Sequence, residues 1–131
     1  MAGHLDRVRK VCLALPEAHE VEAWGEPTFR VRNKLFAMYA AAGNHHGSGR
    51  PSLWIKATHV NQDLVLHSDA DRFFKPPYVG PSGWIGVYLD GKPDWPIIAE
   101  LVRDGYLLTY TLQILNLITG STDQKPICFH Y

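Results

Sequence analysis

The spacing of apolar residues predicts a helix at the start of the chain, followed by short strands. Apolar side chains recur at steps of three or four in residues 4–15, the spacing of one helix stripe, and Pro16 ends it. Alternation of apolar and polar residues predicts strands at 28–32, 52–57 and 83–89, and an apolar run predicts one more at 35–40. Residues 41–51, rich in glycine, are expected to form an exposed loop.

The first two strands are expected to form a hairpin whose turn is Asn33 and Lys34. This register places four apolar side chains on one face, with Val31 opposite Phe36 and Phe29 opposite Met38. A turn one residue earlier would set Val31 opposite Lys34. We favour the first register, because a slip of one residue turns side chains to the wrong face.

Two helices are expected in the second half of the chain. The first covers residues 60–66, and an aromatic and proline-rich bend at 73–81 follows it. Asp94 can cap the second helix, with Pro96 in its first turn, where a missing N–H costs nothing. Gly105 fits the left-handed position that commonly closes a helix.

These elements add up to one α+β domain. We expect an antiparallel sheet of about four to five strands, with an N-terminal helix and C-terminal helices packed on it. The chain has 131 residues, of which 46% are hydrophobic, so one hydrophobic core is enough.

The composition also bounds where the protein acts. No apolar stretch approaches the roughly 20 residues that a membrane-spanning helix needs, and polar residues occupy the N-terminus. Cys12 and Cys128 lie at opposite ends of the chain, where a reducing compartment would keep them as thiols. We therefore expect a cytoplasmic protein with no membrane contact.

The charges balance overall but separate along the chain. Lys and Arg total 13, as do Asp and Glu. An acidic run is followed by residues 27–62, which contain five basic residues and no acid. The acids are Glu17, Glu20, Glu22 and Glu26, and the bases are Arg30, Arg32, Lys34, Arg50 and Lys56. Two interpretations of this charge separation are possible. The acidic and basic segments form solvated faces that pair with each other, or the basic segment forms a binding surface for a charged partner.

No pattern of residues predicts catalysis, a metal or a cofactor. His45 and His46 are adjacent, but they lack the spacing that directs three or four ligands to one metal ion. No nucleophile signature is present, and the glycines at 43–49 do not form a phosphate-binding loop. We expect no catalytic residues, no metal site and no cofactor.

A series of motifs, in order and in register, resembles the MmcQ/YjbR family over about residues 5–108. They are LALP at 13–16, WGEPTFRV at 24–31, KLFA at 34–37, WIK at 54–56, DRFF to PY at 71–78, GWI at 83–85, and ELV at 100–102 before Tyr106. The resemblance implies a compact α+β fold of the secretion-chaperone or frataxin-like kind. It also implies a predicted DNA-binding role with a winged surface.

The resemblance divides the chain into a family-like domain, residues 1–109, and an atypical tail, residues 110–131. The family usually ends in a basic segment, whereas residues 110–118 here are mostly apolar. We expect this segment to pack on the domain or to mediate self-association.

Alternation places one candidate site on the outward face of the sheet. If Phe29 and Ile55 face the core, the opposite face carries basic side chains interleaved with an aromatic ring, a combination that suits a nucleic-acid backbone. The predicted nucleic-acid-binding residues are Arg30, Arg32, Lys34, Trp54 and Lys56. The predicted partner is DNA, bound mainly through phosphates. The alternative is a protein-interaction or chaperone-like module with no nucleic-acid role.

Overall fold

The structure is a computed structural model that describes residues 3–41 and 49–120. The elements in chain order are α1 His4–Leu13, β1 Ala18–Ala23, β2 Glu26–Val31, β3 Lys34–Ala40, β4 Ser52–Ile55, α2 His59–Ser68, β5 Phe73–Phe74, the short 3₁₀ helix η1 Gly80–Ser82, β6 Ile85–Tyr88 and α3 Trp95–Thr119.

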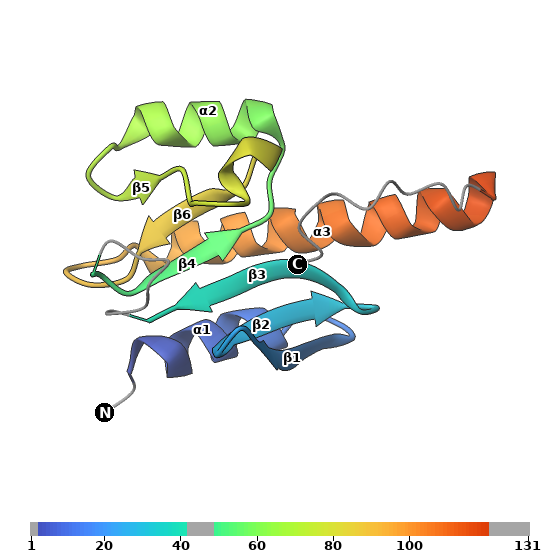
Figure 1. Cartoon of the computed structure of the whole chain (residues 1–131), viewed down its shortest axis with the longest axis horizontal. Helices are drawn as coiled ribbons and strands as arrows, with labels where there is room; N and C mark the ends of the chain where they lie inside the picture. Colours follow the sequence, from blue (N-terminus) through green and yellow to red (C-terminus); the bar gives the residue numbers. More distant parts are fainter. Residues whose placement is uncertain (1–2, 42–48, 121–131) are drawn as a thin grey trace.

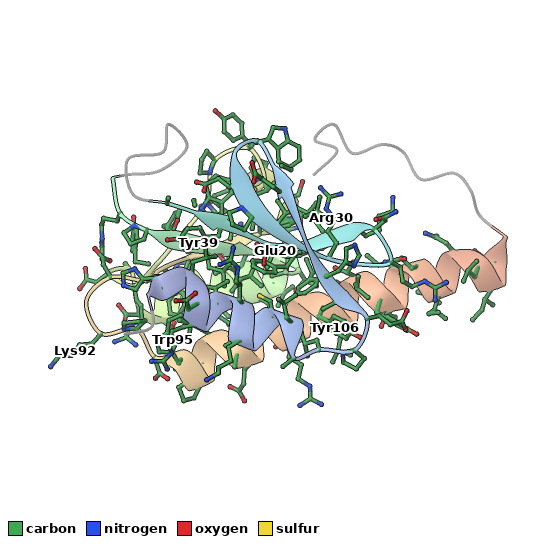
Figure 2. All side chains as sticks on the ribbon, turned by 90° about the horizontal axis from the view of Figure 1, so that it is seen from below. Glu20, Arg30, Tyr39, Lys92, Trp95 and Tyr106 are labelled. Atoms are coloured by element: carbon green, nitrogen blue, oxygen red, sulfur yellow. The ribbon has the colours of Figure 1, made fainter. Side chains whose placement is uncertain are left out.

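The six strands form one antiparallel sheet in the order β1-β2-β3-β4-β6-β5. Figure 2 shows α1 and α3 together below this sheet, and Figure 1 shows α2 beside β5 and β6. The predicted α+β class is confirmed, with six strands in place of four to five. No helix within the described residues is both long enough and apolar enough to span a membrane.

Apolar side chains pack on both faces of the sheet. The helix-side core joins the sheet to α1 and α3, through residues such as Val8, Phe29, Ile55 and Val102. The opposite face carries a second core, made of Leu35, Met38, Ala40, Trp54, Val79 and Trp84. Alternation along each strand therefore sends apolar side chains to both faces of the sheet.

The predicted register of the β2–β3 hairpin is wrong. The turn is Arg32 and Asn33, and Val31 pairs with Lys34. Both turn residues have positive φ, 51° and 69°, as a two-residue turn that matches the strand twist requires. Asparagine tolerates this conformation well.

A β-bulge reconciles this turn with the burial of the apolar residues. Pairing shifts between Phe29 and Arg30, so that Phe29 lies opposite Ala37 while Arg30 lies opposite Leu35. Phe36 is the extra residue, and both Phe36 and Ala37 join the helix-side core. Met38 consequently turns to the second core, away from Phe29.

Two strands were not predicted, and each has a physical reason. β1 has the sequence AHEVEA, in which glutamates and a histidine break the apolar period, and it lies at one edge of the sheet. β5 has only two residues. The acidic run is thus largely a strand: Glu20 binds Arg9 of α1, with both nitrogen–oxygen distances at 2.9 Å.

Gly105 does not end a helix, as the sequence suggested, but lies inside α3. A Cβ placed on Gly105 would come within 2.5 Å of the backbone oxygen of Lys56. Glycine is required there so that the helix can approach the end of β4. The residue with left-handed φ that ends α3 is Gly120, at 69°, and the helix runs without a break across residues 109 and 110.

The described residues contain no group of three or more potential metal ligands. His45, His46 and Cys128 lie outside them. Cys12 is buried in α1 and is not in a disulfide, and burial raises the pKa of its thiol.

Candidate functional site

Four basic side chains lie around the β2–β3 turn, at one end of three neighbouring strands. Strand pairing places Arg30 opposite Leu35, and it places Val31, next to Arg32, opposite Lys34. The backbone N–H of Lys56 donates to the carbonyl of Phe36 at 2.9 Å, which joins the end of β4 to the same region. We call Arg30, Arg32, Lys34 and Lys56 the basic end of the sheet.

Arg30 is the half-buried member of β2. Its Nε donates to the hydroxyl oxygen of Thr28 at 3.3 Å, and the Thr28 hydroxyl donates to the carbonyl of Val21 in β1. Desolvation lowers the pKa of Arg30. The guanidinium is thus held in place by a neutral partner and keeps its positive charge, since an arginine deprotonates only far above neutral pH.

Arg32 and Lys34 are the exposed members, on either side of Asn33. Arg32 holds φ at 51°, a conformation that costs a residue with a Cβ roughly 1–2 kcal/mol. The turn therefore presents two cations to solvent, one of them on a strained backbone.

Lys56 is largely buried where β4 ends. Burial lowers the pKa of its ammonium, and the nearby charge of Lys34 lowers it further. Both causes disfavour the charged form of Lys56, and a bound anion would oppose both.

Trp54 does not lie on an outward surface, as the sequence suggested. The indole is 2% exposed in the second core, and its Nε1 donates to the Ser52 hydroxyl at 3.1 Å. Strand alternation assigned Trp54 to the correct side of the sheet, but Val79 and Trp84 pack with it there. Trp54 therefore cannot stack on a base in this conformation.

Several arginines elsewhere in the molecule are paired with acids. Arg9 binds Glu20, Arg50 binds Asp90 at 2.8 Å, and Arg72 lies 3.6 Å from Asp69. Within residues 3–41 and 49–120, by contrast, no acidic partner lies within ion-pair distance of any member of the basic end. Its charge is therefore not neutralised by an ion pair within these residues.

A second polar hollow, missed by the sequence reasoning, lies at the other end of β6. It has a volume of about 330 Å³ and is lined by residues that include Arg50, Tyr88 and Asp90. The Arg50 guanidinium lies 3.7 Å from the centre of the Tyr88 ring, and its hydrogen bond to Asp90 lowers the pKa of that carboxyl. The charge and hydrogen-bonding capacity of Arg50 are thus satisfied by Tyr88 and Asp90. We interpret these contacts as structural, because they hold Arg50 against the end of β6.

Comparison with known protein families gives a match, and the matched residues contain the whole sheet and its basic end. The YjbR family model matches residues 13–108, which include all four basic residues. The chain belongs to the YjbR family. No curated protein matches the chain.

Two solved structures share the YjbR fold at low sequence identity. The Deinococcus radiodurans protein DR2400, described with a DUF419 domain, is 19% identical with a TM-score of 0.70, over 97% of this chain and 95% of that one. A Pseudomonas syringae protein is 14% identical with a TM-score of 0.64, over 83% of this chain and 99% of that one. At these identities the likeness establishes the fold alone.

Proposed function

We propose that this YjbR protein binds DNA through the phosphate backbone, in the cytoplasm and without catalysis, using the basic end of the sheet. The observation that carries the proposal is a local excess of positive charge. Four cations gather around one turn, and none of them has an acidic partner in the described residues. Phosphates are the anions that such clusters neutralise in protein–DNA interfaces.

Two members of the basic end are held at a cost to the fold. Lys56 is desolvated and lies near the charge of Lys34, and Arg32 occupies a left-handed conformation. Uncharged residues would avoid the first cost, and glycine would avoid the second. Strain and desolvation held at one place are typical of a functional surface.

The proposed contact reads the backbone and not the bases. Arginine and lysine at a strand end can reach phosphate oxygens, whereas Trp54, the one aromatic residue predicted for the site, is buried. Phosphate contacts fix orientation but carry no sequence information. Binding should therefore be similar for unrelated duplexes.

The test is a titration of a fluorescent duplex at several salt concentrations. If the four cations each neutralise one phosphate, the slope of log affinity against log salt is about −3.6. Raising salt from about 50 to 200 mM then weakens binding on the order of 100-fold. Absence of binding to duplex and single-stranded DNA at low salt would overturn the proposal.

Two exposed lysines supply a matched pair of variants. Lys34 belongs to the basic end, whereas Lys92 is an exposed turn residue on the opposite side of the molecule from Arg30 (Figure 2). Lys34→Ala should reduce the slope by about 0.9 and weaken binding to all duplexes. Lys92→Ala should change neither quantity. Equal effects of the two substitutions would show attraction by overall charge and contradict a located site.

A further inference from the structure

The outward face of α3 carries a regular stripe of seven side chains, of which five are exposed and two, Leu101 and Leu108, are half-buried. The residues are Ile97, Leu101, Asp104, Leu108, Thr111, Leu115 and Ile118, at alternating steps of four and three. This is the spacing at which one helix packs along another. The residues of α3 that are buried, among them Ile98, Val102 and Tyr106, lie on its other side.

The two halves of this face differ in shape and charge. The first half contains a hollow of about 420 Å³, lined by apolar residues such as Ile97 and Leu101 together with Glu100, Arg103 and Asp104. The second half has no charged residue from Leu107 to Thr119, and Leu115 and Ile118 are 48% and 74% exposed. Figure 1 shows this second half extending beyond the end of the sheet.

We propose that the outward face of α3 binds a second copy of this chain, with the two α3 helices antiparallel. A symmetric pair needs a surface that is complementary to itself. Antiparallel pairing about residues 107 and 108 supplies one, because the projecting apolar half of each helix meets the hollowed half of the other. Ile97 then faces Ile118 of the partner subunit.

Charge decides the direction of the helices. A parallel pair would place Asp104, which is in the stripe, against Asp104 of the partner subunit, and like charges in contact are unfavourable. In the antiparallel pair Asp104 meets the uncharged half. Asp104 lies opposite Thr111 of the partner subunit, whose hydroxyl can donate to the carboxylate, and Leu101 lies opposite Leu115 of the partner subunit.

Substitutions at two exposed leucines distinguish a specific dimer from nonspecific hydrophobic association. Leu115 is in the stripe, whereas Leu117, 66% exposed, is about 200° away around the helix. Sedimentation velocity of the full chain over a range of concentrations should show a dimer. Leu115→Glu should give a folded monomer whose melting temperature does not depend on protein concentration, and Leu117→Glu should remain dimeric.

The register is tested at Thr111. Thr111→Lys would face Asp104 of the partner subunit and should tighten the dimer about fivefold at low salt, and Thr111→Glu should loosen it. Lys34→Ala should leave the mass unchanged, so the result is independent of DNA binding. A wild-type protein that is monomeric at every concentration would overturn the proposal, as would equal effects of the substitutions at 115 and 117.

Discussion

A close contact at Gly105 decides which residue position 105 can hold. Sequence favoured a helix end at this glycine, because glycine is common just after a helix. The structure uses it for the opposite purpose, to let the middle of α3 lie against the Lys56 carbonyl. No local pattern distinguishes these two uses of glycine, since the second depends on a residue 49 positions away.

Gly105→Ala should destabilise the protein although alanine is the better helix former. The helix gains about 1 kcal/mol, but the new methyl group would lie 2.5 Å from a backbone oxygen, and overpacking of this kind costs roughly 1–3 kcal/mol. Urea unfolding should show the net loss. Leu117→Ala, at an exposed position of the same helix that lies outside the stripe, should change the free energy of unfolding by less than about 0.5 kcal/mol.

At Arg32, by contrast, the left-handed backbone predicts that substitution by glycine stabilises the protein. Arg32→Gly should raise the free energy of unfolding by about 1 kcal/mol, because glycine adopts positive φ without a Cβ clash. The same substitution should weaken DNA binding and reduce its salt slope. Thermal unfolding and fluorescence anisotropy on one sample measure both effects, and a less stable variant would argue against strain at this turn.

The members of the candidate site were partly predictable from the sequence. The acid-free run of residues 27–62 contains all four members of the basic end, because charges close in sequence on paired strands remain close in space, but it also contains Arg50, which pairs with Asp90. Trp54 was misplaced for a physical reason. Alternation assigns a side chain to a face of a strand, but the segment that covers that face, with Val79 and Trp84, comes from further along the chain.

Among the elements, the β2–β3 hairpin shows that the apolar period of a sequence can locate strands without predicting how they pair. The apolar period located β2 and β3 correctly, yet the register follows from the turn geometry and from a bulge. One extra residue at Phe36 lets Val31 pair with a lysine while every large apolar side chain stays buried. A bulge of this kind leaves no signal in the pattern, since the apolar count is unchanged.

Phe36 and Lys34, both near the start of β3, should differ strongly in their contribution to stability. Phe36 is fully buried, with its ring edge-on to Tyr106 at 5.6 Å, so Phe36→Ala should cost about 3–5 kcal/mol through lost burial and a cavity. Lys34 is exposed, and Lys34→Ala should cost less than about 0.5 kcal/mol. Guanidinium unfolding of the two variants compares them directly. Similar costs would mean that Phe36 is not part of the helix-side core.

At the scale of the whole molecule, Lys56 links the basic end to stability. Its pKa is lowered in the folded state, so the fold disfavours its charged form, and this cost is present at neutral pH. Stability should rise as the pH approaches 10.5, the ordinary value, and the lysine loses its proton.

Lys56→Met should therefore raise the melting temperature at pH 7 while weakening DNA binding. The gain should shrink as the pH is raised toward 10.5, because the wild-type lysine then becomes neutral as well. Calorimetry at several pH values measures this difference. A gain that does not depend on pH would point to better packing by methionine instead of the removal of a desolvated charge.

The two edges of the sheet determine how the molecule behaves when it is crowded. An edge strand with free backbone groups can add a strand from a neighbouring molecule and start an aggregate. β1 carries two charged residues, Glu20 and Glu22, which disfavour the addition of another strand at this edge. Glu20 is also hydrogen-bonded to Arg9 of α1. β5, at the other edge, offers only two residues. Neither described edge is a good template for polymerisation, which leaves helix surfaces and side chains as the routes by which copies of this protein can meet.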